Sequence, residues 1–164
     1  MAEYYSEFFS GVIIWRVMEG RLEILCVPTT FNGGLQVKVP GGKDEEGETP
    51  AETAVREVRE ETGLAVGPLM ELEKARWKDP LDGHVKYFFL TSFRACQGVL
   101  RTESIVSRDK PKVLHPPEFR QYEDLERNIF PTHKPALTVA ARWFGDQLAK
   151  THPGVASQLQ YALR

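Results

Sequence analysis

The chain has 164 residues, of which 41% are hydrophobic and 27% are charged, and its formal net charge is −2. This length is enough for one well-buried domain spanning residues 1–164, and no apolar run approaches the roughly 18 residues of a membrane span. A pI of about 6.1 argues against a general nucleic-acid binder, which would show a basic stripe and a high pI.

The N-terminal sequence and the two cysteines indicate where in the cell the protein is expected. The N-terminus lacks a basic region followed by an apolar signal core. Cys26 and Cys96 form neither a metal-ligand spacing nor a disulfide framework, so both are predicted to be buried thiols. We therefore expect a cytoplasmic protein with no membrane partner, and we leave a homodimer open.

The first forty residues indicate strands. Residues 8–17 are rich in Phe, Val, Ile and Trp, and residues 22–27 follow after a turn. Residues 36–39 alternate polar and apolar, which predicts a short strand leading to Gly41 and Gly42. A glycine pair permits close approach of the backbone to a ligand, so we expect both glycines to take part in a binding site.

Capping chemistry predicts a helix after the glycine pair. Thr49, Pro50 and Glu52 form a capping box with proline at the first helical position, so the helix begins at Pro50. It runs to Thr62, and Gly63 supplies the left-handed residue that ends it. Four residues are predicted to form the core-facing stripe: Ala51, Ala54, Val55 and Val58.

Acidic side chains concentrate in this region. Residues 42–64 carry eight acids against three bases, a net charge of −5, which leaves +3 for the rest of the chain. Glu57, Glu60 and Glu61 are expected together on the other side of the helix, where like charges repel. A hard cation such as Mg²⁺ would offset this repulsion. The alternative is a solvated charged face paired with Arg56 and Arg59.

The spacing in residues 42–64 also resembles a family signature. The segment matches GX5EX7REUXEEXGU, where U is a bulky aliphatic residue, and this pattern is that of the Nudix hydrolases. Every fixed position is present over 23 of the 164 residues. These positions are Gly42, Glu48, Arg56, Glu57, Val58, Glu60, Glu61, Gly63 and Leu64.

The resemblance implies a fold and an activity. The fold would be an α/β/α sandwich with a central mixed β-sheet. The activity would be hydrolysis of a nucleoside diphosphate linked to another group, as in a nucleotide sugar, ADP-ribose, a dinucleoside polyphosphate or a nucleoside triphosphate. The alternative is a nucleotide-binding or regulatory domain of the same fold without significant turnover.

The resemblance also assigns roles to box residues. Glu57, Glu60 and Glu61 would be ligands of Mg²⁺ or Mn²⁺, and Arg56 would orient the carboxylates. Glu48 and Gly42 would brace and shape the loop before the helix. Catalysis would then rest on Arg56, Glu57, Glu60 and an acid outside the box.

Beyond the box, residues 69–77 and 84–95 are predicted strands, joined by a turn at residues 79–83. Residues 96–117 are long for a connection and rich in basic side chains, so they form either a substrate-covering lid or a variable excursion, with residues 99–106 as a hairpin strand. Arg101 and Lys110 are our candidates for contact with substrate phosphates, with Arg108 and Lys112 beside them.

The remaining segments supply a candidate base and a structural helix. Glu118, presented by a stiff proline-rich approach, is our candidate for the acid outside the box. A short helix is expected from Glu123 to near Asn128. The last helix lies within residues 135–150, and His133 beside it is expected to be a surface or capping residue. Its predicted core stripe is Leu137, Ala141, Phe144 and Leu148.

Overall fold

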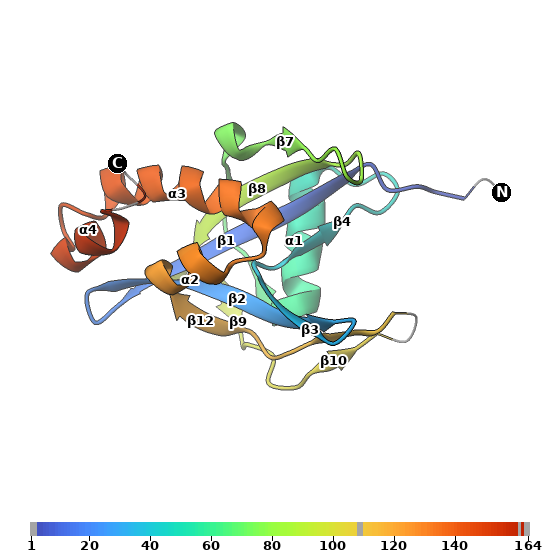
Figure 1. Cartoon of the computed structure of the whole chain (residues 1–164), viewed down its shortest axis with the longest axis horizontal. Coiled ribbons are helices and arrows are strands. Elements are labelled where there is room, and N and C mark those ends of the chain that lie inside the picture. The colour runs from blue at the N-terminus through green and yellow to red at the C-terminus, as the bar shows by residue number, and fades with distance from the viewer. Residues whose placement is uncertain (1–2, 108–109, 161, 163–164) are drawn as a thin grey trace.

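The computed structural model describes residues 3–107, 110–160 and 162. Arg108 lies outside the described residues. The centre of the fold is a mixed β-sheet with the strand order β10-β11-β2-β1-β8-β6. Figure 1 shows its long strands β1, β2 and β8 crossing the middle of the molecule. The long strands β1 (Phe8–Met18) and β2 (Arg21–Phe31) are antiparallel, whereas β1 runs parallel to β8 (Val85–Ser92). The predicted strands near residues 8–17 and 22–27 are confirmed, and the second extends further than expected. The predicted strand 84–95 is confirmed over Val85–Ser92, but its last residues form the 3-10 turn Phe93–Ala95.

Shorter strands extend this sheet. Strands β12 and β3 pair with β2, β4 pairs with β1, and β7 pairs with β8, while β5 and β9 form a separate small sheet. Their bounds are β3 Gly34–Lys38, β4 Gly41–Lys43, β5 Leu64–Ala65, β6 Met70–Glu71, β7 Trp77–Lys78, β9 Gln97–Gly98, β10 Ile105–Val106, β11 Lys112–Leu114 and β12 Glu118–Gln121. The predicted hairpin strand over 99–106 is therefore reduced to its last two residues, which pair with β11.

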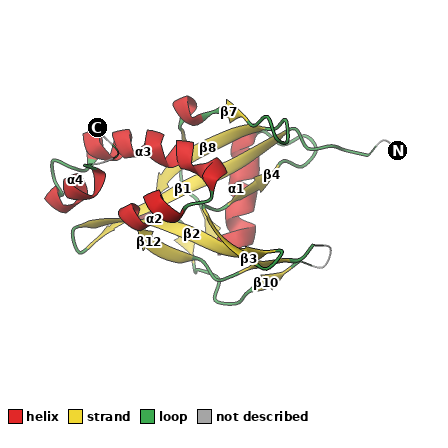
Figure 2. Cartoon of the chain, in the orientation of Figure 1, coloured by secondary structure: helices red, strands yellow, loops and turns green. Residues whose placement is uncertain are grey.

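Helices cover both faces of the sheet. The helix α1 (Pro50–Thr62) lies behind the sheet in Figure 2, and α2, α3 and α4 lie in front of it. These three span Tyr122–Asn128, Lys134–Gln147 and Pro153–Leu159, and short 3-10 turns lie at Glu73–Ala75, Phe93–Ala95 and Pro131–His133. The expected α/β/α sandwich is confirmed. None of the described helices is long and apolar enough to cross a membrane.

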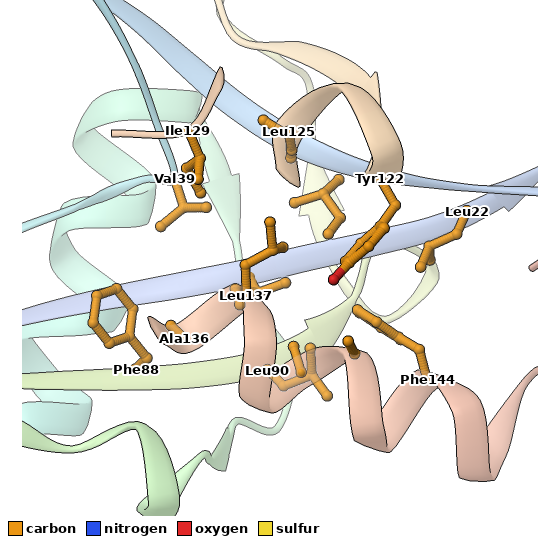
Figure 3. Packing of buried hydrophobic residues seen from close by; sticks show 14 of the residues in the cluster. Leu22, Val39, Phe88, Leu90, Tyr122, Leu125, Ile129, Ala136, Leu137 and Phe144 are labelled. Atoms are coloured by element: carbon orange, nitrogen blue, oxygen red, sulfur yellow. The ribbon is translucent and has the colours of Figure 1, made fainter. Parts of the chain in front are cut away.

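The two faces of β1 have separate hydrophobic cores, because successive side chains on a strand point to opposite faces. Val12 and Ile14 pack with Ala54 and Val58 of α1. Ile13, on the other face, belongs to the larger cluster under α2, α3 and α4. Figure 3 shows that cluster, with the predicted stripe residues Leu137 and Phe144 pointing toward Phe88, Leu90 and Tyr122.

Two sequence predictions outside the box are wrong in part. The predicted strand at 69–77 is interrupted by the 3-10 turn Glu73–Ala75, which buries Leu72 and Ala75. The amide of Leu72 still donates to the carbonyl of Phe88 at 2.8 Å, so the segment stays attached to β8. Cys26 is buried as expected, but Cys96 is partly exposed.

The core-facing side of α1 also differs from the prediction. Ala54 and Val58 are fully buried, but Val55 is 44% exposed. Two threonines complete the buried side because their hydroxyls find local acceptors: Thr53 donates to Glu48 at 2.9 Å, and Thr62 donates to the carbonyl of Val58 at 2.6 Å. Hydrophobicity alone does not identify these threonines, so the real stripe is rotated from the predicted one. Ala51 is exposed as well.

This rotation predicts different effects of the same substitution at two neighbouring valines. Val58→Ala should lower the free energy of unfolding by about 2 kcal/mol, because two buried methyl groups are lost and a cavity remains. Val55→Ala should change it by less than about 0.5 kcal/mol, since the site is exposed. Urea unfolding of the two variants measures both values. Equal losses would show that the predicted stripe, and not the observed one, faces the core.

Candidate active site

The start of α1 is fixed by its cap. Thr49 Oγ1 accepts from the Glu52 amide at 3.2 Å, and Glu52 Oε1 accepts from the Thr49 amide at 3.0 Å. At the other end Gly63 has φ of 86°, and its amide donates to the carbonyl of Arg59. The helix therefore has the predicted bounds. Fixed ends determine where each glutamate along the helix points.

Arg56 connects the helix to the loop before it. Its guanidinium donates from Nε to Glu48 Oε2 at 2.8 Å and from Nη2 to the carbonyl of Lys43 at 2.9 Å. Nη1 donates to Glu57 Oε1 at 2.9 Å and to Glu60 Oε2 at 3.3 Å. The hydrogen bonds from Arg56 hold the pKa of Glu48 down to about 2. One cation thus organises three carboxylates.

The two glycines allow the helix to approach the sheet closely. A Cβ atom on Gly42 would lie 2.4 Å from Cδ of Glu57. A Cβ on Gly41 would lie 2.5 Å from the carbonyl oxygen of Ser10. This close approach lets the Gly41 amide donate to Glu61 Oε1 at 2.7 Å. Any larger residue at position 42 would displace the Glu57 carboxylate.

Burial sets the charge state of the inner glutamates. It raises the pKa of Glu61 to about 8, against the hydrogen bond from Gly41. It also raises the pKa of Glu57, although Arg56 opposes the shift. Glu60 is more open, with 56% of its side chain exposed. Without a further cation, the negative charges of the buried Glu57 and Glu61 carboxylates are therefore poorly neutralised.

These groups line a pocket of about 670 Å³. Its acidic residues are Glu45, Glu57, Glu60, Glu61, Asp79 and Asp82, and its basic residues are Lys38, Lys43, Arg56, Lys86, Lys110 and Lys112. Phe9, Val39 and Phe130 contribute apolar surface. The structure thus brings together Gly41, Gly42, Arg56, Glu57, Glu60, Glu61 and Lys110, all of which were predicted from the sequence.

Arg101 is not among the residues that line this pocket, so the geometry gives no support to its predicted contact with substrate phosphates. Its guanidinium donates to the backbone carbonyls of Glu61 at 2.9 Å, Leu114 at 3.2 Å and His115 at 3.0 Å, and to that of Glu103. Burial lowers the pKa of Arg101. The side chain therefore connects the end of α1 to β11, and its hydrogen bonds go to backbone carbonyls and not to the glutamate carboxylates.

Glu118 is also placed away from the pocket. It belongs to β12, opposite Cys26 of β2, and its carboxylate accepts from Arg120 at 3.0 Å. The pocket is lined by other acids. The structure therefore gives no geometric support to Glu118 as the catalytic base. The two prolines before it lead into a regular strand pairing, which directs its side chain to Arg120.

The carboxylates of Glu57, Glu60 and Glu61 are the ligand type that a divalent cation prefers, although their oxygens do not converge on one point in this structure. Among the described residues, no three His, Cys, Asp or Glu side chains already converge on one point. Arg56 holds Glu57 and Glu60 in this structure. The donor set consists of carboxylate oxygens, as a hard cation prefers, and the exposed Glu60 has room to turn. The elevated pKa of Glu61 further marks a position that lacks a positive charge.

The family model described as the NUDIX domain matches residues 8–145. The chain belongs to the Nudix family. Both the resemblance and the expectation of a Nudix hydrolase are thereby confirmed at the level of family and fold. A comparison with curated proteins finds no match.

Solved structures share the Nudix fold at low sequence identity. MutT studied from Aliivibrio salmonicida and Vibrio cholerae has 23% identity and a TM-score of 0.60, covering 82% of this chain and 97% of that one. The NUDIX domain of Shewanella oneidensis NrtR, complexed with ADP ribose, has 17% identity and a TM-score of 0.64, covering 87% and 90%. The binary complex of a C. elegans Ap4A hydrolase has 14% identity and a TM-score of 0.62, covering 84% and 98%.

Several pocket residues of this Nudix domain were missed. Lys38 and Phe130 lie side by side in the pocket, with Nζ of Lys38 4.8 Å from the ring centroid of Phe130. Lys86 is buried and bonds Asp82 at 2.6 Å. In the sequence these residues belong to a strand end, a short Ile-Phe-Pro segment and an aromatic strand. Of these three, only Lys38 could have been identified as a pocket residue from the sequence, because it lies three residues before the glycine pair.

His133 stands at the N-cap position of α3, as one of the two predicted alternatives had it, but it is not a surface residue and its side chain does not cap the helix. Its side chain is buried among aromatic rings, including that of Phe88 at 5.5 Å between centroids. Nδ1 accepts from the Val39 amide at 3.3 Å, and burial lowers the pKa of His133 to about 3. His133 is therefore a neutral residue that supports the strand leading to the glycine pair.

The shifted pKa of Glu61 predicts a pH-dependent stability. A carboxyl whose folded pKa is about 8, above its value of 4.5 in a model peptide, contributes stability that is present below about pH 4.5 and is lost as the pH rises through 8. Glu61→Gln should remove this pH-dependent loss of stability. In EDTA, the free energy of unfolding of the Glu61→Gln variant minus that of the native chain should therefore rise between pH 5 and pH 9, as measured by urea unfolding.

Glu46→Gln is the matched control, since Glu46 is an exposed acid of the turn before α1. It removes the same charge and should show no such trend. A stability difference for Glu61→Gln that stays constant with pH would contradict the burial of a poorly compensated carboxyl.

Proposed function

We propose that this Nudix protein is a metal-dependent pyrophosphohydrolase that cleaves a nucleoside diphosphate linked to another group. The observation that carries the proposal is the position of Glu57, Glu60 and Glu61 in one pocket with several lysines. Carboxylates alone would repel a phosphate, and lysines alone would bind it without activating water. Their combination suits a phosphoanhydride that is held and hydrolysed.

Glu57, Glu60 and Glu61 would hold Mg²⁺ or Mn²⁺. When bound, such an ion neutralises charge on phosphate oxygens and makes water a better nucleophile. Arg56 keeps the carboxylates of Glu57 and Glu60 on the pocket side of the helix. Glu57 or Glu60 would take the proton as water attacks phosphorus, because both line the pocket whereas Glu118 does not.

The substrate range is the finer part of the proposal. Solved structures of the same fold include a MutT, an Ap4A hydrolase and a domain complexed with ADP ribose. ADP ribose and Ap4A, which two of these names print, both contain a nucleotide attached through a phosphate chain. We propose the same class for this chain, with a small-molecule nucleotide diphosphate derivative as its partner.

A turnover panel tests the activity. Nucleoside triphosphates, nucleotide sugars, ADP-ribose and dinucleoside polyphosphates are incubated with the protein in Mg²⁺ or EDTA, and the phosphorylated products are separated and quantified. At least one compound should be hydrolysed in Mg²⁺ and not in EDTA. Binding of a panel member without any hydrolysis would instead favour the nucleotide-binding domain without turnover.

Paired variants test the assignment of the site. Glu57→Gln and Glu60→Gln should each lower turnover by about a hundredfold or more, as expected when a metal ligand or general base is lost. Circular dichroism should show that both variants remain folded. Glu118→Gln is the control, since it removes the same charge outside the pocket, and it should leave turnover nearly unchanged. A large loss in Glu118→Gln, with Glu57→Gln active, would reverse the assignment.

A further inference from the structure

The basic residues of the pocket fall into two groups. Arg56 and Lys86 are engaged in ion pairs, Arg56 with the box glutamates and Lys86 with Asp82. The other four, Lys38, Lys43, Lys110 and Lys112, form no ion pair with any described residue. Lys38 and Lys112 are the half-buried members of this second group, so their charges are partly shielded from water without a direct carboxylate partner among the described residues.

Strand register places these two lysines on one face. Val27, Thr29 and Phe31 alternate onto the same face of β2, and both Val27 and Thr29 line the pocket. Lys38 of β3 lies opposite Val27, and Lys112 of β11 lies opposite Phe31. Because β3 and β11 flank β2, the lysines approach the pocket from two sides of one strand.

The lysines also lie close to the glutamates and to each other. Burial raises the pKa values of Glu57 and Glu61, and the charge of Lys112 opposes both shifts, while that of Lys38 opposes the shift of Glu61. The pKa of Lys38 is itself lowered, first by burial and then by the charge of Lys112. Two like charges held near each other, beside carboxylates that they do not contact, would be stabilised by an anion between them.

Lys110 extends this basic surface to the rim of the pocket. It is exposed, lines the pocket, and its carbonyl accepts from the Lys112 amide at 2.7 Å. Three lysines therefore line the same pocket as the glutamates, with Lys38 against Phe130 and Lys110 exposed to solvent. Several cations in the pocket of the carboxylates suit a chain of several phosphates.

We propose that Lys38, Lys112 and Lys110 bind the phosphates of a chain longer than the two held at the glutamates, so that the preferred substrates carry three or more linked phosphates. This inference rests on the proposed function and narrows it. A nucleotide sugar or ADP-ribose has only two phosphates, both of which would lie at the glutamates. A nucleoside triphosphate or dinucleoside polyphosphate supplies additional phosphates for the lysines.

A series of substrates that differ only in phosphate number tests the proposal. Diadenosine diphosphate, triphosphate and tetraphosphate have identical ends, so kcat/KM in Mg²⁺ isolates the effect of chain length. The native protein should prefer the tetraphosphate to the diphosphate by about tenfold or more, since hydrogen bonds to charged groups are worth about that factor. The double variant K38M/K112M should lose about tenfold or more on the tetraphosphate, mainly through KM, and less than about threefold on the diphosphate.

The control variant is K74M/K150M, which removes two exposed lysines outside the pocket and therefore has the same net charge as K38M/K112M. It should retain the chain-length preference, and K38R/K112R should retain most of it. Calorimetric binding of the same three compounds in EDTA gives a readout that does not depend on turnover, and should show the same order of affinity.

Three outcomes would overturn the proposal, and the last is distinguishable from the first two because it also removes the hydrolase function. Mg²⁺-dependent hydrolysis with equal kcat/KM across the three compounds, or equal losses in K38M/K112M on all of them, would show that the lysines only neutralise the glutamates. The proposed hydrolase function would stand in that case. Absence of Mg²⁺-dependent hydrolysis for every member of the wider panel would overturn the hydrolase function and this inference with it.

Discussion

The guanidinium of Arg56 is the interaction on which the site depends. It binds Glu48 and the carbonyl of Lys43 on the loop side, and Glu57 and Glu60 on the helix side. The helix and the loop are thereby fixed relative to each other. A lysine would not serve as well, because the planar fork of arginine reaches several acceptors in fixed directions at once.

One helix has to serve both a hydrophobic core and an acidic pocket. Ala54 and Val58 attach α1 to the sheet, while Glu57 and Glu61 lie on the adjoining side, against Gly41 and Gly42 of β4. Close packing at Gly42 brings the Glu57 carboxylate near the backbone and removes water from it. The same closeness makes Glu61 costly to ionise. The hydrophobic packing of Ala54 and Val58 therefore offsets the free-energy cost of ionising Glu61 in a buried position.

The sequence predicted features that depend on local chemistry. The cap at Thr49, the ends of α1 and the gathering of the box residues follow from spacing along one helix, so short-range rules were enough. The roles of Arg101 and Glu118 depend on strand pairings between distant segments. Arg101 bonds carbonyls of α1 and β11, and Glu118 is directed to Arg120 by the pairing of β12 with β2. No periodicity in the sequence reports such pairings, and the buried threonines of α1 were missed because their hydroxyls are satisfied locally.

We propose that Glu57 and Glu60, which Arg56 holds, form a divalent-metal site together with Glu61, which accepts from the Gly41 amide. Mn²⁺ binding followed by electron paramagnetic resonance tests it directly, because the signal of free Mn²⁺ falls as the ion is bound. The native chain should bind Mn²⁺ saturably, Glu57→Gln should bind at least about tenfold more weakly, and Arg56→Lys should also weaken binding, as changes around metal ligands typically do. Saturable binding of equal strength in all three proteins, or none in the native chain, would contradict the account.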